Sequence, residues 1–331
     1  MQEPEVPDAV PLTRAAVRRL LAGARSAGHL DSGSLAVAVS GGADSLALAA
    51  ATAYLAPSQE LAVHGLIVDH GLQPDSAAVA EKAAEQLRGL GLAEVRVLPV
   101  RVTGFGGMEA AARRARYAAL RAARPAPDAL VLLGHTLDDQ AETVLLGLGR
   151  GSGPRSIAGM RPLDPPWARP LLGLPGRVTM AACTRLGLSP WQDPHNADPR
   201  FTRVRLRNEV LPLLEDVLSG GVAPALARTA TQLREDADAL DAWARTVMET
   251  DVTPGQRAVP ADGLIDLPVA VRRRVLRLWL LGEGVRELTD PQLRAADDLL
   301  GNWRGQGGVW LPGGLVVRRA HGRLHLDRGD D

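Results

Sequence analysis

Short apolar runs alternate with longer mixed segments through the first half of the chain. The runs are rich in Val and Leu and are bounded by Gly, Pro or polar residues, as buried parallel strands are. They cover residues 35–40, 61–68, 95–100 and 129–134. The segments between them predict helices over 44–55, 76–90, 109–124 and 138–148, after a first helix over 13–27 that Thr13 would cap. This alternation predicts an α/β fold with a doubly wound parallel sheet.

The pattern changes near residue 150. Residues 151–175 are rich in Gly, Pro and Arg and are predicted to be irregular, and three prolines predict a loop over 189–200. Beyond it the pattern predicts helices over 204–218, 223–249, 268–281 and 291–300, a linker over 251–263, and β-hairpins in the tail. The long helix carries an apolar residue at every seventh position, at Leu226, Leu233, Leu240 and Val247. That stripe favours packing against this chain's own domains over a coiled-coil partner.

The composition is that of a folded protein with two or three domains. Of its 331 residues, 46% are hydrophobic and 23% are charged, which excludes disorder as the dominant state. No apolar stretch approaches the roughly 20 residues of a membrane helix, and the acidic start MQEPEVPDAV is unlike a secretory signal. The single cysteine, Cys183, excludes an internal disulfide and a Cys-based metal site, and its apolar helical context favours buried packing. A cytoplasmic protein without a membrane partner is expected.

Charge is distributed unevenly, although the formal net charge is zero. Residues 150–210 hold ten arginines and only four acidic residues. Such an excess can attract an anionic partner even when the whole chain is neutral. The simpler alternative is a solvated basic face that binds nothing.

The hexapeptide SGGADS, residues 40–45, directly follows the first apolar run and precedes a predicted helix. Its adjacent glycines let the backbone turn tightly and bring N–H groups close to an anion, and the helix start adds the positive end of its dipole. The arrangement suits the phosphates of ATP, and Asp44 would suit a bridging Mg²⁺. The alternative is a plain strand–helix turn. The hexapeptide is neither a Walker loop nor a dinucleotide fingerprint.

A second polar stretch, GHTLDDQAET at residues 134–143, follows the fourth apolar run. Asp139 and Glu142 are three residues apart, so they share a helix face at the sheet edge where ligands of open α/β sheets bind. Capping of this helix by Asp138 is expected as well. Two further stretches carry polar residues of interest. One is VDHGL at 68–72, which ends the second apolar run, and the other is the helix predicted over 109–124.

That earlier helix places Glu109, Arg113 and Arg116 on one face, followed by Tyr117. By itself this set is equally consistent with a solvated, salt-bridged surface. His70 and His135 lie beside the motif residues, where contact with a nucleotide and hydrogen bonding at a helix entry are both open.

SGGADS resembles the signature of the PP-loop ATP pyrophosphatases, which cleave ATP between its α- and β-phosphates. The ordered set of stretches resembles the tRNA(Ile)-lysidine synthase family over roughly residues 35–215. The remaining stretches of this set are RGSG at 150–153, RPLL at 169–172, a loop with Trp191, Asp193 and Asn196, and FTRVRLRN at 201–208. In the last segment Val204 replaces the family's usual Asn, and Asn208 its usual His.

The resemblance implies a ligase that uses ATP and Mg²⁺ to join L-lysine to C2 of the wobble cytidine of the isoleucine tRNA with a CAU anticodon. The cytidine would first be adenylated, with release of pyrophosphate, and lysine would then displace AMP. Members of the family include homodimers, so a homodimer is among the expected assemblies.

The resemblance also implies roles for individual residues. Asp44, Arg113, Asp139 and Glu142 would be catalytic, with Asp44 on Mg²⁺, and Asp139 and Glu142 would bind lysine. ATP would be bound by Ser40, Gly41, Gly42, Ala43, Asp44, Ser45, Asp69, His70 and His135. The tRNA backbone would be contacted by Arg150, Arg169, Arg203, Arg205 and Arg207.

Three parts are expected on this basis. Residues 1–215 would form the PP-loop catalytic domain, 216–255 a long helical connector, and 256–331 a small α+β tRNA-binding domain. Two other functions remain as alternatives: an adenylating ligase that acts on a small carboxylate without RNA, and a tRNA-binding protein that has lost catalysis. The arginine-rich segment and the GHTLDDQAET helix speak against the first, and the intact SGGADS with Asp139 and Glu142 against the second.

Overall fold

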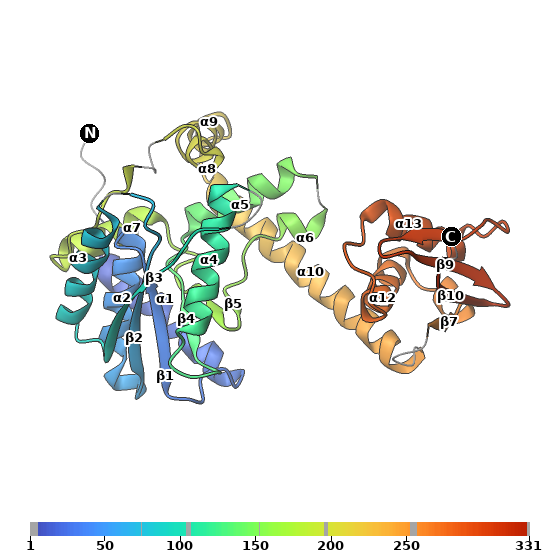
Figure 1. Cartoon of the computed structure of the whole chain (residues 1–331). Coiled ribbons are helices and arrows are strands. Elements are labelled where there is room, and N and C mark those ends of the chain that lie inside the picture. Colours follow the sequence, from blue (N-terminus) through green and yellow to red (C-terminus); the bar gives the residue numbers. More distant parts are fainter. Residues whose placement is uncertain are drawn as a thin grey trace. The chain divides into compact units, whose positions relative to one another are not determined.

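The computed structural model describes residues 6–73, 75–103, 107–151, 153–194, 198–251 and 257–329. By its internal contacts the chain divides into two compact units, Met1–Thr231 and Gln232–Asp331. The α/β elements of the first unit are α1 (Ala9–Ser26), β1 (Ser34–Val39), α2 (Ala43–Leu55), β2 (Ala62–Asp69), α3 (Ser76–Gly89), β3 (Glu94–Pro99), α4 (Met108–Ala122), β4 (Leu130–Leu132), α5 (Leu137–Gly149), α6 (Pro154–Ile157), β5 (Leu163–Asp164), β6 (Trp167–Ala168) and α7 (Gly176–Arg185). Figure 1 shows them in chain order from blue to yellow-green.

The sheet of the first unit has the strand order β3-β2-β1-β4-β6-β5. Every neighbouring pair is parallel except β5 and β6. After β1 the chain continues to β2 and β3 on one side of β1, and then crosses to β4 on the other side. The direction of winding therefore reverses between β1 and β4, and ligands of open α/β sheets bind at the carboxyl ends of such strands.

Alternate residues of the central strands pack into two different cores. Leu35, Val37 and Val39 of β1 join a cluster with α1, α2, α3 and α7, whereas Ala36 packs with Leu120 of α4 on the other face. A strand presents successive side chains to opposite faces, and helices cover both faces of this sheet. The predicted doubly wound architecture is confirmed.

Two sequence predictions in this unit are wrong. Thr13 does not cap α1, which begins at Ala9; its hydroxyl is buried and donates to the Ala9 carbonyl. Residues 151–175 are not wholly irregular, because they supply β5 and β6. The two strands hold two residues each, too short to show an alternation pattern, and the prolines between them occupy their connection.

The C-terminal part of the arginine-rich region, from Thr202 onward, is helical. It comprises α8 (Thr202–Arg205), a π-helical turn (Leu206–Val210) and α9 (Leu211–Val217), close to the helix predicted over 204–218. The loop predicted over 189–200 is free of strands and α-helices in its described part, which excludes residues 195–197.

The 30-residue helix α10 (Val222–Asp251) confirms the predicted helix over 223–249. Its first ten residues belong to the first unit and the others to the second. Leu226 packs with Leu211 and Leu214 of the first unit, and Leu240 and Val247 pack in the core of the second. Three of the four residues of the apolar stripe therefore pack within this chain, as predicted.

The second unit pairs helices with a small antiparallel sheet. Its elements after α10 are β7 (Ala258–Pro260), α11 (Asp262–Ile265), α12 (Val269–Gly282), α13 (Asp290–Gly301), β8 (Val309–Leu311), β9 (Leu315–Ala320) and β10 (Arg323–Arg328), with sheet order β7-β10-β9-β8. The predicted helices and tail hairpins are confirmed. The linker predicted over 251–263 is wrong where it is described, because β7 pairs with β10 in the sheet; residues 252–256 lie outside the described residues.

Among the described helices, no single one is long and apolar enough to span a bilayer. The helices Thr202–Val217 and Val222–Thr250 reach the necessary length and apolar character only as a pair, and they are bent by 95° at the break between them.

Candidate active site

The loop after β1 is shaped by its own hydroxyl groups. The Ser40 N–H donates to the Ser45 Oγ at 3.1 Å, and the Ser45 hydroxyl donates to the Gly42 carbonyl at 2.9 Å. Gly41 has φ +85, a conformation that a side chain would disfavour. Gly42 precedes α2 without a side-chain cap, so the first N–H groups of this helix are available to an anion.

Asp44, in the first turn of α2, is held from a distant part of the chain. The Thr179 hydroxyl on α7 donates to its Oδ1. Burial raises the pKa of the Asp44 carboxyl to about 6, and the negative charges of Asp139 and Asp138 raise it further, against lowering by Thr179 and Arg207. A carboxylate so placed gains from any cation that joins it.

Gly134 brings the end of β4 against this loop. A Cβ at this position would lie 3.0 Å from the Asp44 carbonyl carbon and 3.0 Å from the Ser45 nitrogen. These are backbone atoms that cannot rotate away, so a side chain here would force the two loops apart by a few tenths of an ångström. The loop after β1 and the loop after β4 thereby meet at one edge of the sheet.

The start of α5 is capped differently from the prediction. Thr136 is the N-cap residue, and Asp139 completes a capping box by accepting the Thr136 N–H at 2.8 Å. Asp138, expected to cap the helix, instead accepts the Gly176 N–H at 2.7 Å and so ties α7 to α5. One oxygen of Asp139 is thus used for structure, while the other faces Arg207 at 3.3 Å.

Glu142 is fully buried and is paired with two arginines of the 202–210 segment. The Arg207 Nε donates to its Oε1 at 2.7 Å, and the Arg203 Nη1 donates to its Oε2 at 3.4 Å. Burial raises the pKa of the Glu142 carboxyl, and the positive charge of Arg207 opposes this most strongly. The predicted lysine-binding pair, Asp139 and Glu142, is therefore brought together and already faces a cation.

Two histidines and three arginines gather beside this edge. Burial lowers the pKa of His135 to about 4, with Arg169, Arg116 and Arg113 lowering it further against Asp139. Burial also lowers the pKa of His70, beside Arg116. The Nδ1 atoms of both histidines are buried without a hydrogen-bond partner among the described residues. These neutral imidazoles can therefore donate to or accept from a ligand.

The arginines of the α4 face have distinct surroundings. Arg113 is exposed, and its guanidinium donates to the Tyr117 hydroxyl at 3.4 Å. Arg116 is half-buried, and burial lowers the pKa of its guanidinium. The Tyr117 ring packs edge-on against Trp167 of β6 at 4.6 Å. The helix begins at Met108, and the side chain of Glu109 lies outside the described residues.

The five arginines predicted to bind tRNA do not form one surface. Arg150 and Arg205 are exposed, and Arg205 pairs with Glu209 of its own helix. Arg169 is only 6% exposed and donates to the Arg161 carbonyl, which leaves it poorly placed for a phosphate backbone. Arg203 and Arg207 point to Glu142.

Other motif residues take supporting positions. Asp69 accepts the Gly71 N–H at 2.9 Å, which shapes the turn after β2. The Trp191 N–H donates to the Gly41 carbonyl, and Asp193 accepts from the Gln73 amide. Ser152 and Asn196 of the motifs lie outside the described residues. Val204 is half-buried and Asn208 exposed.

Sequence reasoning missed three contributors. Thr179 and Gly134 hold Asp44 in place, and Gln140 binds both backbone groups of Met160, at 2.8 and 3.1 Å. Gln140 and Gly134 lie within the motif and could have been singled out from it. Thr179 carries no local signal, because it lies 135 residues from its partner.

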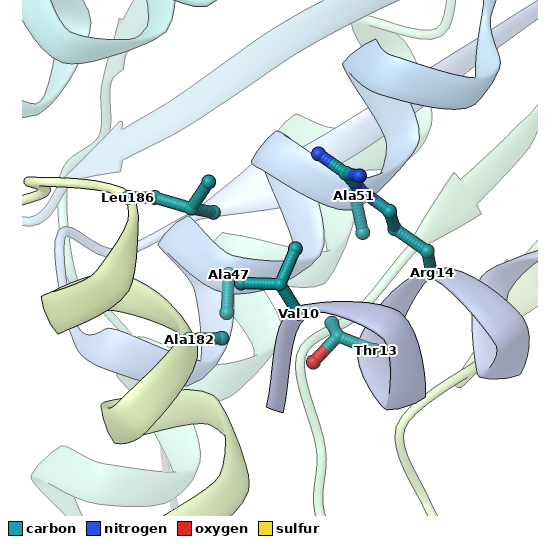
Figure 2. Close-up of a pocket in the computed structure, with 7 residues that line it drawn as sticks. All are labelled: Val10, Thr13, Arg14, Ala47, Ala51, Ala182 and Leu186. Atoms are coloured by element: carbon teal, nitrogen blue, oxygen red, sulfur yellow. The ribbon is translucent and has the colours of Figure 1, made fainter. Parts of the chain in front are cut away.

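A surface pocket elsewhere in this unit is separate from these residues. Figure 2 shows it between α1, α2 and α7, lined by Val10, Thr13, Arg14, Ala47, Ala51, Ala182 and Leu186. Its lining is mostly aliphatic and includes none of the predicted site residues. Cys183 follows the lining residue Ala182 in the sequence and is buried, as predicted. Burial raises the pKa of its thiol to about 12.

The acidic residues at the sheet edge fit a hard cation only in combination with a ligand. Among the described residues, no three His, Cys, Asp or Glu side chains are grouped to hold a metal ion. Mg²⁺ commonly takes one or two protein carboxylates and completes its shell with phosphate oxygens and water. Asp44, with its raised pKa and its place in the first turn of α2, is suited to that limited share.

Two family models match the chain. One, described as a PP-loop domain, matches residues 14–214, and the other, described as the TilS substrate binding domain, matches residues 260–325. In both matched regions the described residues form helices and strands. The PP-loop match covers more than half of the chain.

Several curated proteins are similar over most of their length, and each bears the name tRNA(Ile)-lysidine synthase. That of Rhodococcus jostii (strain RHA1) is 57% identical over 337 residues, 99% of this chain and 98% of the relative. That of Mycobacterium tuberculosis (strain ATCC 25618 / H37Rv) is 59% identical over 308 residues, 91% of this chain and 93% of the relative. That of Rhodococcus erythropolis (strain PR4 / NBRC 100887) is 59% identical over 295 residues, 88% of each.

Proposed function

We propose that this chain, which belongs to the tRNA(Ile)-lysidine synthase family, is an ATP-dependent ligase that joins L-lysine to C2 of the wobble cytidine of the CAU-anticodon isoleucine tRNA. The observation that carries the proposal is the pairing of two features on adjacent strands. A backbone anion site follows β1, and two carboxylates follow β4. An adenylating enzyme that takes a cationic amine needs both.

In the first step the cytidine O2 attacks the α-phosphorus of ATP, and the bond to the β-phosphate oxygen breaks to release pyrophosphate. The N–H groups at the start of α2 bind the phosphates, and Ser40 and Ser45 fix the loop that presents them. Mg²⁺ held by Asp44 would neutralise phosphate charge. Arg113, exposed on α4, would contact the adenylate phosphate.

In the second step the ε-nitrogen of lysine attacks C2, and the C2–O2 bond breaks so that AMP leaves with the former O2. Asp139 and Glu142 would bind the ammonium group, and one of them would accept the proton that the amine must lose before it can attack. His135 and His70, whose Nδ1 atoms have no hydrogen-bond partner among the described residues, would contact the nucleotide.

The remaining assignments extend to the partner and the setting. We propose that residues 1–215 form the catalytic domain, 216–255 a connector, and 256–331 a tRNA-binding domain, supported by the match of the substrate binding model to 260–325. Arg150 and Arg205, both exposed, are the predicted arginines best placed for tRNA phosphates. A cytoplasmic location and a homodimer are proposed with them.

The test is incorporation of labelled lysine into two transcripts, the CAU-anticodon isoleucine tRNA and elongator methionine tRNA, with ATP and Mg²⁺. Label in the isoleucine transcript alone is the expected result. Release of pyrophosphate without RNA, and no label in either transcript, would contradict the proposal and favour a ligase for a small carboxylate.

A further inference from the structure

The carboxylates proposed to bind lysine are already occupied by a cation from this chain. The Arg207 Nη2 lies 2.6 Å from Glu142 Oε1 and 3.3 Å from Asp139 Oδ1, and Nε donates to Glu142 as well. Arg207 also acts electrostatically on Asp44. Arg207 thus pairs with both carboxylates of this acidic cluster, whereas Arg203 pairs only with Glu142, at 3.4 Å.

A guanidinium and an ammonium compete for the same oxygens. Both are donor-only cations, and each would pair with Asp139 and Glu142. Glu142 is completely buried, whereas the Arg207 side chain is 46% exposed, so the guanidinium reaches inward from the surface. An incoming lysine amine therefore meets Arg207 at the position that it would itself take.

The segment that carries Arg207 has a second, outward side. Arg200 and Arg205, with Thr202 and Leu206, line a hollow on that side. Arg200 is 83% exposed and pairs with Asp198, and Arg205 is 61% exposed and pairs with Glu209. Arg207 itself lies in the π-helical turn Leu206–Val210, a backbone form that is rare and often marks functional sites. Phosphates are the ligands that such closely spaced arginines bind most strongly.

We infer that Arg207 closes the amine site of the free protein as a resident counter-ion, and that tRNA opens it by drawing the 202–210 segment onto its phosphates. This inference rests on the proposed function. In this inference Arg207 is a positioning residue, because it contacts the carboxylates that would bind lysine and not the reacting atoms. Lysine then binds well only after the RNA substrate is in place.

The consequence is a measurable coupling between two ligands. If tRNA raises the affinity for lysine by some factor, lysine must raise the affinity for tRNA by the same factor. We expect a factor of about ten, within the usual range for coupled sites. Titration calorimetry of L-lysine into the unaltered protein, with and without the CAU tRNA transcript and without ATP, measures it directly.

Variants then assign the coupling to one side chain. Arg207→Gln removes the competing cation, so lysine should bind the tRNA-free protein about tenfold more tightly, and tRNA should no longer change its affinity. Arg205→Gln is the matched control, because it removes the same charge from the same segment but faces Glu209. It should weaken tRNA binding and leave lysine binding to the free protein as it was.

The outcomes separate this inference from the proposed function. Equal lysine affinity with and without tRNA in the unaltered protein would overturn the inference, even if labelled lysine is incorporated into tRNA. Unchanged or weaker lysine binding by a folded Arg207→Gln variant would overturn it as well. If Arg207→Gln does not fold, the two-way titration of the unaltered protein decides alone. Failure of incorporation at saturating lysine would instead refute the proposed function.

Discussion

The two strand–helix junctions at the sheet edge present groups of opposite charge preference, one from the backbone and the other from side chains. The β1–α2 junction presents backbone N–H groups. Ser40 and Ser45 form hydrogen bonds with each other and within their own loop. The β4–α5 junction presents carboxylates, and those are bonded to arginines more than sixty residues further along the chain. An anion site built from the backbone is complete once the loop has folded, whereas a cation site built from side chains depends on what else can reach it.

The largest effect is expected from removing the one carboxylate of the β1–α2 junction. Asp44→Ala should reduce lysine incorporation and pyrophosphate release at least about a thousandfold, because phosphate charge loses its metal partner. Affinity for tRNA, measured by filter binding, should stay within about twofold. Asp75→Ala, at the exposed start of α3, is the control and should retain activity. Loss of tRNA binding in Asp44→Ala would show that Asp44 is structural.

Gly134→Ala tests whether the two junctions depend on each other. Its new Cβ would lie 3.0 Å from backbone atoms of Asp44 and Ser45, so the free energy of unfolding should fall by about 2 kcal/mol and ATP binding should weaken. Gly23→Ala, inside α1 with open space around it, should be neutral or slightly stabilising. Urea unfolding of both variants makes the comparison. Equal stability of Gly134→Ala and the unaltered protein would mean that the junctions tolerate separation.

The pH dependence of stability tests the raised pKa of the half-buried Asp44 carboxyl. The folded-state pKa of Asp44 is raised from 3.8 to about 6, so the folded state holds this proton more tightly than the unfolded state does. Its stabilising contribution is complete below the unfolded value and is lost as the pH rises through about 6. Relative to the unaltered protein, Asp44→Asn should therefore gain about 2 kcal/mol of unfolding free energy between about pH 4 and pH 7. A constant difference across that range would refute the raised pKa.

The smallest effect is expected below the β1–α2 junction, where Cys183 contacts the Ala43 carbonyl from α7 at 3.3 Å. Cys183→Ala should lower the unfolding free energy by about 1 kcal/mol and leave turnover within about twofold, because the thiol contributes only packing and one weak hydrogen bond. The native thiol should resist a thiol reagent until the protein is unfolded, since it is buried and its pKa is raised to about 12. Rapid labelling of the folded protein, or inactivation by the substitution, would show a role beyond packing.

The same contrast explains what could be predicted from the sequence. The doubly wound sheet and the β1–α2 loop follow from local patterns: Val- and Leu-rich runs, two glycines and a helix start. The occupation of Glu142 by Arg207 could not be predicted, because arginines in an arginine-rich segment are usually solvated and the pairing spans 65 residues. Thr136 was missed as a cap because Asp138 is also a good capping residue, and only the backbone geometry chooses between them.

The edge strands were missed for a related reason. β5 and β6 are held in the sheet by pairing with β4 and with each other, not by a pattern of their own. Predictions for individual site residues stay predictions, since their roles depend on ligands. The family itself was identified correctly from the motifs, because their order along the chain is far more specific than any one of them.

In helix α5, Gln140 has a structural role that is separate from the proposed lysine-binding role of Asp139 and Glu142, and this separation matters for redesign. The Gln140 side-chain amide accepts the Met160 N–H and donates to the Met160 carbonyl. These two hydrogen bonds join α5 to the segment that leads into β5. Asp139 and Glu142 lie at other angular positions on the same helix. An attempt to make the enzyme accept a different amine should therefore vary positions 139 and 142 together with 207 and leave 140 untouched, because changing the glutamine would loosen the frame on which any new specificity has to be built.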